Sequence, residues 1–146
     1  MPYPNNRLST EEHRLRSKII TYYLLRSDAY QNCRSLHLYE SYSDEVDTQY
    51  IMHHAKKSSR DIYRPTPDPL NNEIADIIVI PGRKFDMHMT RHGRGCGYYD
   101  RFLHNITAIK IGLCYQMQLF DKLERKSWDI PMDMVITEKG IFMPPV

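Results

Sequence analysis

The chain lacks most of the features that mark specialised protein classes. It has only three cysteines, Cys33, Cys96 and Cys114, an odd number with no C-x-x-C pair. This spacing excludes a disulfide framework and a cysteine-rich zinc site, so reduced thiols are expected. Apolar runs are only a few residues long, far below the ~20 residues that span a bilayer, and the N-terminal Met-Pro-Tyr-Pro-Asn-Asn lacks a signal-peptide core. We therefore expect a cytoplasmic protein without a membrane partner.

The chain also carries little excess charge of either sign. Its formal net charge is +2, with 26% charged and 41% hydrophobic residues. This composition is typical of a globular protein and argues against a disordered chain or a general nucleic-acid-coating protein. A length of 146 residues suits one domain with a single core, because domains commonly have ~100–150 residues. We expect a single domain over residues 1–146 and a monomer.

Helical and strand patterns alternate along the chain. Ser9 and Glu12 stand at capping-box spacing and predict a helix over residues 10–25. The stripe of this helix that is expected to face the core is Leu15, Ile19, Tyr22 and Tyr23. Further helices are predicted over residues 47–59, 98–104 and 116–125, and strands over residues 35–39, 61–64, 74–80, 108–115 and 134–137. The alternation predicts a three-layer α/β fold with a mostly parallel central sheet and helices on both faces.

The most informative stretch follows the strand expected at residues 77–80. Four β-branched residues closed by Pro-Gly predict a strand buried on both faces, and ligands bind beyond the C-terminal ends of such strands. Residues 83–101 hold five Lys or Arg against two Asp, a local charge of +3, and include glycines at positions 93, 95 and 97. Glycine lets the backbone approach a ligand, and arginine forks bind anions. The loop therefore predicts a phosphate-binding site.

These residues closely resemble the signature of the 5-formyltetrahydrofolate cyclo-ligase family, also called methenyltetrahydrofolate synthetase. The matching positions are Pro81-Gly82, Phe85-Asp86, Arg91, Gly93-Arg94-Gly95, Gly97-Tyr98-Tyr99-Asp100 and Arg101-Phe102-Leu103. Similar segments also occur at Glu45-Val46-Asp47-Thr48, at Lys110-Ile111-Gly112-Leu113 with Gln118, and at Trp128-Asp129-Ile130-Pro131. A signature with this many positions in fixed register is far more specific than a lone glycine pattern.

The resemblance implies an ATP-dependent C–N ligase that closes 5-formyltetrahydrofolate to 5,10-methenyltetrahydrofolate and releases ADP and phosphate. It implies ATP binding by residues 91–99, with Arg94 and Tyr98 as catalytic residues. The implied ATP contacts are Arg91, His92, Gly93, Arg94, Gly95, Cys96, Gly97, Tyr98 and Tyr99. The implied folate contacts are Glu45, Arg94, Gly95, Gly97 and Tyr98, and the implied Mg²⁺ ligands are Asp100 and Asp129. The small-molecule substrate would be the only partner, with no nucleic acid.

The chain departs from the family pattern at several places. Family members begin with a helix that brings a Lys and an Arg to the ATP phosphates, and they carry a longer segment where this chain has a short Pro-rich connector between residues 63 and 76. Within the signature, Arg83-Lys84, Met89, His92 and Cys96 replace residues that the family usually has. Each lost cation can cost on the order of a hundredfold in phosphoryl transfer, so we expect much reduced or absent turnover in this chain taken alone.

Simpler interpretations stay open for each candidate residue. Loop arginines are commonly solvated, Asp100 could pair with Arg101 or cap a helix, and Glu45 could simply occupy the first turn of a helix. Two other function classes also remain. A non-catalytic nucleotide- or folate-binding relative would keep the loop and lose the reaction. An RNA-binding module could use the Arg-Gly and Tyr-Tyr pairs, although one short basic loop provides little affinity for nucleic acid.

Overall fold

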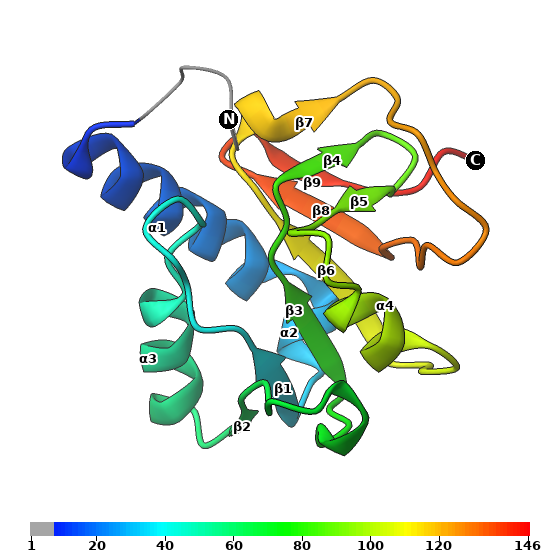
Figure 1. The fold of residues 1–146 in the computed structure, drawn as a ribbon. Helices are drawn as coiled ribbons and strands as arrows, with labels where there is room; N and C mark the ends of the chain where they lie inside the picture. Colours follow the sequence, from blue (N-terminus) through cyan, green and yellow to red (C-terminus); the bar gives the residue numbers. More distant parts are fainter. Residues whose placement is uncertain (1–7) are drawn as a thin grey trace.

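The computed structural model describes residues 8–146, and its centre is a six-stranded sheet of order β2-β1-β3-β6-β8-β9 (Figure 1). The strands are β1 (Ser35–Leu38), β2 (Asp61–Tyr63), β3 (Ile77–Ile80), β6 (Ile109–Leu113), β8 (Met134–Thr137) and β9 (Gly140–Phe142). Neighbouring strands pair in parallel, except that β8 and β9 form an antiparallel hairpin. The predicted mostly parallel sheet is therefore confirmed. Residues 1–7, on which the expectations about a leader and an N-terminal helix rest, lie outside the described residues.

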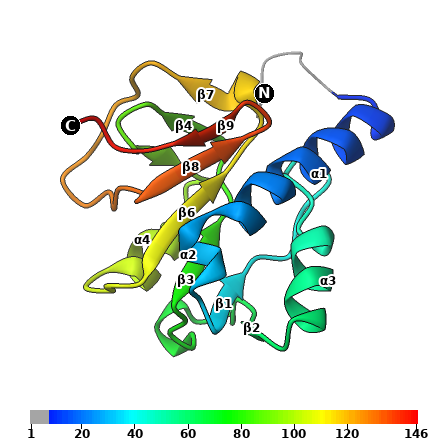
Figure 2. The same ribbon diagram turned by 180° about the vertical axis from the view of Figure 1, so that it is seen from behind.

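Helices cover both faces of this sheet. They are α1 (Thr10–Arg26), α2 (Asp28–Gln31), α3 (Gln49–Lys57) and α4 (Tyr98–Leu103). The two views show α1 and α3 against one face and α4 against the other (Figures 1 and 2). Ser9 caps α1 as predicted, because its side chain accepts a hydrogen bond from the Glu12 N–H. No helix among residues 8–146 is long and apolar enough to cross a membrane.

The central strand β3 explains how two cores form around one sheet. All four of its residues are buried, and successive side chains point to opposite faces. Ile77 and Val79 pack in the core under α1 and α3, and Ile78 and Ile80 pack in the core under α4. Since β3 lies between β1 and β6, its backbone is hydrogen-bonded along both edges. The residues that follow β3 are thus held at a fixed point of the molecule.

A second, three-stranded sheet lies on the α4 side of the central sheet. Its order is β5-β4-β7, with β4 (Lys84–Asp86), β5 (Arg91–His92) and β7 (Leu119–Phe120). Phe85 of β4 is fully buried, and its ring lies directly over Gly112 of β6. A side chain at position 112 would collide with this ring. Gly112 therefore allows the small sheet to pack closely against the central sheet.

The prediction of a helix over residues 116–125 is wrong. The structure has a 3-10 turn, Gln116–Gln118, followed by β7 and then irregular backbone. Leu119 pairs with Phe85, and the Leu123 N–H donates to the buried Asp86 carboxylate at 2.8 Å. These contacts with a distant part of the chain replace the bonds that a helix would make. Tertiary pairing therefore overrides the local helical preference here.

The prediction of which face of α1 is buried is also partly wrong. Leu15 and Tyr22 are 59% and 55% exposed. The buried side chains of α1 belong to Ser17, Ile20, Thr21 and Leu24. Ser17 and Thr21 are acceptable in the core because their hydroxyls form hydrogen bonds there. The buried face of α1 is accordingly more polar than the apolar stripe suggested.

Candidate functional site

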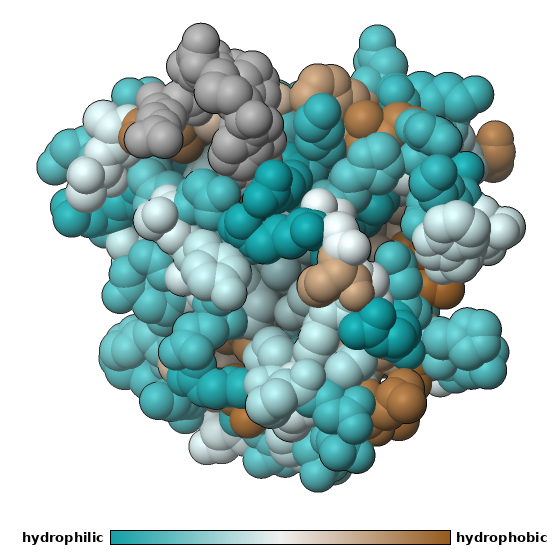
Figure 3. Space-filling view, viewed as in Figure 1, coloured by the Kyte–Doolittle hydropathy of each residue, from teal (hydrophilic) through white to brown (hydrophobic). Residues whose placement is uncertain are grey.

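A cavity of about 860 Å³ opens beyond the C-terminal end of β3, where Pro81 and Gly82 line it. The surface on this side of the molecule is mostly hydrophilic (Figure 3). The structure brings all the predicted site residues to this one cavity. They are Glu45, Arg91, His92, Gly93, Arg94, Gly95, Cys96, Gly97, Tyr98, Tyr99, Asp100 and Asp129. The cavity is lined by residues from five separate segments of the sequence, 39–45, 64–65, 81–82, 91–100 and 124–129, as parallel α/β sheets allow.

The glycine-rich loop has a backbone conformation in which residues other than glycine would be strained. Gly95 and Gly97 have φ angles of +91° and +70°, in the region that L side chains rarely adopt. At Gly93, an added Cβ would lie 2.5 Å from the Arg91 guanidinium nitrogen Nη2. Gly93 therefore leaves room for a neighbouring cation, and Gly95 and Gly97 allow the turn into α4. The loop presents its backbone at the mouth of the cavity.

Arg91 is held firmly in the wall of the cavity. Its Nε donates to the Pro81 carbonyl oxygen at 2.7 Å, and its guanidinium lies 5.0 Å from the centre of the Tyr99 ring. Burial lowers the pKa of Arg91, whereas the nearby Asp100 carboxylate raises it. A cation whose position is fixed in this way can face an anion without large rearrangement.

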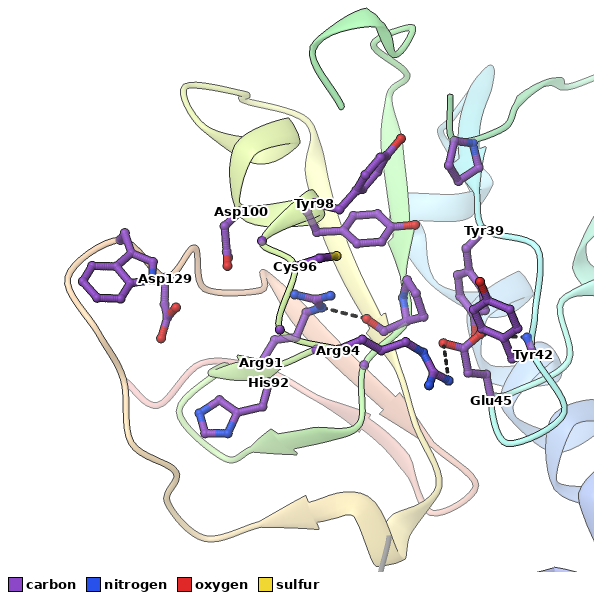
Figure 4. Close-up of a pocket in the computed structure, with 18 of the residues that line it drawn as sticks. Tyr39, Tyr42, Glu45, Arg91, His92, Arg94, Cys96, Tyr98, Asp100 and Asp129 are labelled. Carbon is purple, nitrogen blue, oxygen red and sulfur yellow. Dashed lines mark hydrogen bonds and ion pairs between the residues drawn. The ribbon is translucent and has the colours of Figure 1, made fainter. Parts of the chain in front are cut away.

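Arg94 reaches across the cavity mouth to two carboxylates, and Figure 4 shows the one that belongs to Glu45. Its Nη2 lies 2.8 Å from Asp44 Oδ1 and 3.7 Å from Glu45 Oε2. The guanidinium also lies 4.7 Å from the centre of the Tyr42 ring. Arg94 therefore connects the glycine loop with the loop that follows β1. An anion that enters the cavity would compete with these carboxylates for the guanidinium.

Glu45 is the most buried carboxylate facing the cavity, with 6% exposure. Its Oε1 accepts a hydrogen bond from the Tyr42 N–H at 2.8 Å. Burial raises the pKa of Glu45, and this effect outweighs the opposing influences of that hydrogen bond and of Arg94. Figure 4 shows the carboxylate beside Arg94 on the Tyr39 and Tyr42 side of the pocket. A buried carboxylate with room in front of it can accept hydrogen bonds from a ligand.

The two adjacent tyrosines serve different purposes. Tyr99 is 8% exposed, and its ring packs against the Arg91 guanidinium. Tyr98 borders the cavity, but its hydroxyl donates to the Thr66 carbonyl oxygen at 2.5 Å and accepts from Asn72 Nδ2 at 2.9 Å. These bonds fasten the Pro-rich connector to the start of α4. Tyr98 therefore offers its ring, rather than a hydroxyl without partners, to the cavity.

Asp100 and Asp129 lie on the side of the pocket opposite Glu45 (Figure 4). Asp129 Oδ2 accepts from the Lys126 N–H at 2.8 Å, which holds the turn before the carboxylate. No group of three or more His, Cys, Asp or Glu side chains within residues 8–146 could hold a metal ion. Mg²⁺ is commonly bound by one or two carboxylates together with phosphate oxygens and water. This pair suits a metal that arrives with a nucleotide rather than a protein-only metal centre.

His92 and Cys96 complete the predicted phosphate loop. His92 Nε2 lies 2.6 Å from the Glu124 carbonyl oxygen, so it donates there and ties β5 to the segment after β7. Cys96 is exposed at the tip of the loop, whereas Cys33 and Cys114 are buried. The Cys96 carbonyl oxygen accepts from Arg101 Nη1 at 2.9 Å, so Arg101 supports the loop from outside the cavity. Both predicted residues line the cavity but lie toward its solvent side.

Sequence reasoning missed several residues that line the same cavity: Tyr39, Glu40, Tyr42, Arg64, Glu124, Lys126 and Trp128. It also missed Asp44, which pairs with Arg94. A signal was present for Tyr42 and Asp44, because they occur in a polar loop directly after a predicted strand. The structure, but not the sequence, marks Trp128, because 64% of this large side chain is exposed. Arg64 and Lys126 carried no comparable signal.

The sequence is similar to those of known proteins. A model of the 5-formyltetrahydrofolate cyclo-ligase family matches residues 68–138. The 5-formyltetrahydrofolate cyclo-ligase of Escherichia coli K12 is 32% identical over 107 residues, which cover 71% of this chain and 55% of the relative. The chain thus spans about half the length of the first curated relatives that it matches. The cyclo-ligase of Mus musculus is 24% identical over 175 residues, which cover 90% of this chain and 86% of the relative.

Two solved structures have closely similar folds. The NMR structure of 5,10-methenyltetrahydrofolate synthetase from Aquifex aeolicus has a TM-score of 0.79 at 26% identity, and the match covers 93% of this chain and 84% of that chain. The synthetase from Mycoplasma pneumoniae has a TM-score of 0.78 at 27% identity, and the match covers 90% of each chain. The similarity therefore extends over most of the chain.

Proposed function

We propose that the chain, which is similar to members of the 5-formyltetrahydrofolate cyclo-ligase family, converts 5-formyltetrahydrofolate and ATP into 5,10-methenyltetrahydrofolate, ADP and phosphate. The observation that carries the proposal is the convergence of the signature residues on one cavity. The phosphate-type loop at residues 91–97 and the buried carboxylate of Glu45 face the same space. One cavity can thus hold the ring of the folate and the phosphates of ATP together.

The chemistry requires a better leaving group than the formyl oxygen. Transfer of the γ-phosphoryl group to that oxygen lets N10 attack the same carbon, after which phosphate leaves with the oxygen and the ring is closed. Arg91 and Arg94 would balance the charge on the phosphoryl group, and the glycine-loop backbone would approach it closely. Such transfer depends on alignment and charge stabilisation, which fixed cations supply without reorganisation. Phosphate would also draw Arg94 away from Asp44, 2.8 Å distant in this structure.

Glu45 would bind the folate. A carboxylate accepts two hydrogen bonds side by side, which suits the N–H groups on the edge of a pterin ring. The burial of Glu45 strengthens such bonds because water does not compete with the ligand. We propose that Tyr98 acts through its ring beside the reacting formyl group, since its hydroxyl is bonded to Thr66 and Asn72.

Asp100 and Asp129 would hold Mg²⁺ together with the ATP phosphates. When bound there, the metal would supply positive charge against the transferring phosphoryl group. The two carboxylates line the cavity on the side away from Glu45, so a metal there would not occupy the folate position. A cytoplasmic location and a monomeric state without a nucleic-acid partner belong to the same proposal. The small net charge of +2 supports the absence of a nucleic-acid partner.

The proposal is tested by mixing the 146-residue protein with 5-formyltetrahydrofolate and Mg-ATP and following methenyltetrahydrofolate by absorbance. Calorimetry with each ligand alone is run in parallel, and Lys139→Ala, a change in an exposed turn, is the control. Formation of product that requires both ligands is the expected result, at a reduced rate because of the loop substitutions. Binding of both ligands without product would instead support a non-catalytic relative. Binding of neither ligand would contradict the proposal.

A further inference from the structure

The backbone beside Glu45 is held on the side away from the cavity. The Glu45 carbonyl oxygen lies 2.7 Å from His13 Nε2 and accepts from the Tyr115 hydroxyl at 3.3 Å. Two residues later, the Asp47 N–H donates to Ser17 Oγ at 2.9 Å. His13 and Ser17 are one turn apart on α1, and Tyr115 follows β6. Elements from distant parts of the chain therefore meet on one short stretch of backbone.

The protons on these groups can be assigned from the partners. A carbonyl oxygen only accepts, so His13 must carry its proton on Nε2 to make the 2.7 Å contact. Tyr115 donates to the same oxygen, so Ser17 is the donor in the 3.2 Å contact between the two hydroxyls. Burial raises the pKa of Tyr115, which keeps its hydroxyl protonated. Each hydroxyl thus accepts one hydrogen bond and donates one, and the network is complete.

This network fixes the carboxylate without touching it. The Glu45 side chain faces the cavity and is held there by the Tyr42 N–H, whereas its carbonyl faces α1. A shift of the carbonyl would turn the peptide and swing the side chain out of place. His13 makes the shorter of the two contacts with that carbonyl, at 2.7 Å against 3.3 Å. It is also half-buried and reaches Glu45 across 32 positions of sequence.

We propose that His13 is a positioning residue for Glu45, which sets the carboxylate where the folate ring must meet it. The inference rests on the proposed function, because it assigns Glu45 to the folate. The effect is expected in the affinity for folate and not in the affinity for ATP, since the phosphate-binding residues lie on the other loop. A helix remote from the cavity lining would thereby determine how well one of the two substrates binds.

The first test compares His13→Leu, His13→Gln and the control Arg14→Ala by calorimetry. Leu removes the donor, whereas the Gln amide can still donate to the carbonyl. Arg14 is exposed on the same helix and, within residues 8–146, pairs with the exposed Glu11 at 3.9 Å. We expect His13→Leu to weaken 5-formyltetrahydrofolate about tenfold, as the loss of one hydrogen bond implies, with ATP affinity within about twofold. His13→Gln should recover most of the loss, and Arg14→Ala should match wild type.

A second measurement separates this inference from the proposed function. In the ligand-free protein, the Glu45 carboxyl is titrated by carbon-13 NMR, and its pKa is compared between wild type and His13→Leu. Loss of positioning should let water reach the carboxyl and lower its pKa toward the ordinary value of 4.5. If the pKa falls and wild type binds no folate, the proposed function fails and the positioning role stands. An unchanged pKa with unchanged folate affinity overturns the positioning role, and so does equal weakening of both substrates.

Discussion

The two loops that face each other across the cavity are built in opposite ways. In the segment 45–48, after β1, Glu45, Val46 and Thr48 are at most 6% exposed. Its backbone is hydrogen-bonded to side chains from α1 and from residues that follow β1 and β6. In the loop 93–97, after β5, the three residues in the middle are exposed, and two glycines have positive φ. One wall is a fixed carboxylate, and the other is a glycine turn that carries an arginine.

The difference suits the two kinds of ligand that we propose for the cavity. A flat heterocycle is recognised by hydrogen bonds with strict geometry, so its acceptor must be positioned before binding. A phosphate chain presents charge on many oxygens, and arginine can meet it in several orientations. The segment 45–48 therefore needs hydrogen bonds on the side away from the cavity. The loop 93–97 needs a flexible backbone that follows a well-anchored strand. Four changes test this comparison, beginning with the base of the loop.

The largest effect is expected for Asp86→Ala. The buried Asp86 carboxylate accepts from the N–H groups of His88, Thr90 and Leu123 at 2.9, 2.8 and 2.8 Å. Each buried N–H left without a partner costs ~1–3 kcal/mol, so the free energy of unfolding should fall by about 3 kcal/mol or more. Urea denaturation measures this, with the exposed Asp121→Ala as control. A loss below ~1 kcal/mol would mean that the turn between β4 and β5 does not depend on this anchor.

The same variant has a defined pH dependence. Burial raises the pKa of Asp86, but the N–H donors outweigh burial and keep the pKa below the ordinary 3.8. A depressed native pKa contributes stability that is present above pH 3.8 and is lost as the pH falls through the native value. The difference in stability between wild type and Asp86→Ala should therefore be constant near neutrality and shrink in acid. A difference that grows toward acid would contradict the assignment.

The second effect is expected for Arg94→Ala on nucleotide binding. It removes a charge-assisted contact of roughly 1.5–3 kcal/mol, so ATP should bind about tenfold to a hundredfold more weakly. Lys139→Ala removes an equal charge from an exposed turn and should leave ATP affinity unchanged. Calorimetry with Mg-ATP measures both. Equal affinities for the two variants would remove this loop from the nucleotide site.

A double-mutant cycle on Gly93 and Arg91 gives the third effect. A Cβ at position 93 would lie 2.5 Å from Arg91 Nη2, so Gly93→Ala must displace the guanidinium. We expect about a tenfold loss of ATP affinity in Gly93→Ala, comparable with the loss of one hydrogen bond. In an Arg91→Ala background the added methyl meets no guanidinium, so the second change should have little further effect. Additive losses would show that Gly93 acts through its backbone instead.

Local sequence predicted much of the fold and one half of the site. Ser9 with Glu12 and the run Ile77–Ile80 carry their signals within a few residues, and α1 and β3 form there. The glycine loop is also a local motif. The helix predicted over residues 116–125 failed because β7 forms only by pairing with β4, more than thirty residues earlier. The support of Glu45 by His13 was missed for the same reason, since only the folded chain brings them together.

The smallest effect is expected for Glu45→Gln on stability. Burial raises the pKa of Glu45 above the ordinary 4.5, so ionisation costs the native state more than the unfolded chain. Between 4.5 and the raised native pKa the native state holds more protons, and stability falls as the pH rises through that window. At neutral pH the ionised carboxylate is therefore destabilising. The Gln side chain has the same shape and its oxygen can still accept from the Tyr42 N–H.

Glu45→Gln should accordingly melt slightly above wild type at pH 7, and the advantage should vanish below the ordinary carboxyl pKa of 4.5. Thermal denaturation at both pH values measures this, and Glu40→Gln is the matched control because that carboxylate is exposed in the same loop. Folate binding should weaken in Glu45→Gln at the same time, since an amide replaces one acceptor with a donor. If Glu45→Gln raises the melting temperature and weakens folate binding, the carboxylate of Glu45 is retained for binding at a cost in stability. A lower melting temperature at pH 7 would instead mean that Glu45 serves mainly to pair with Arg94, 3.7 Å away.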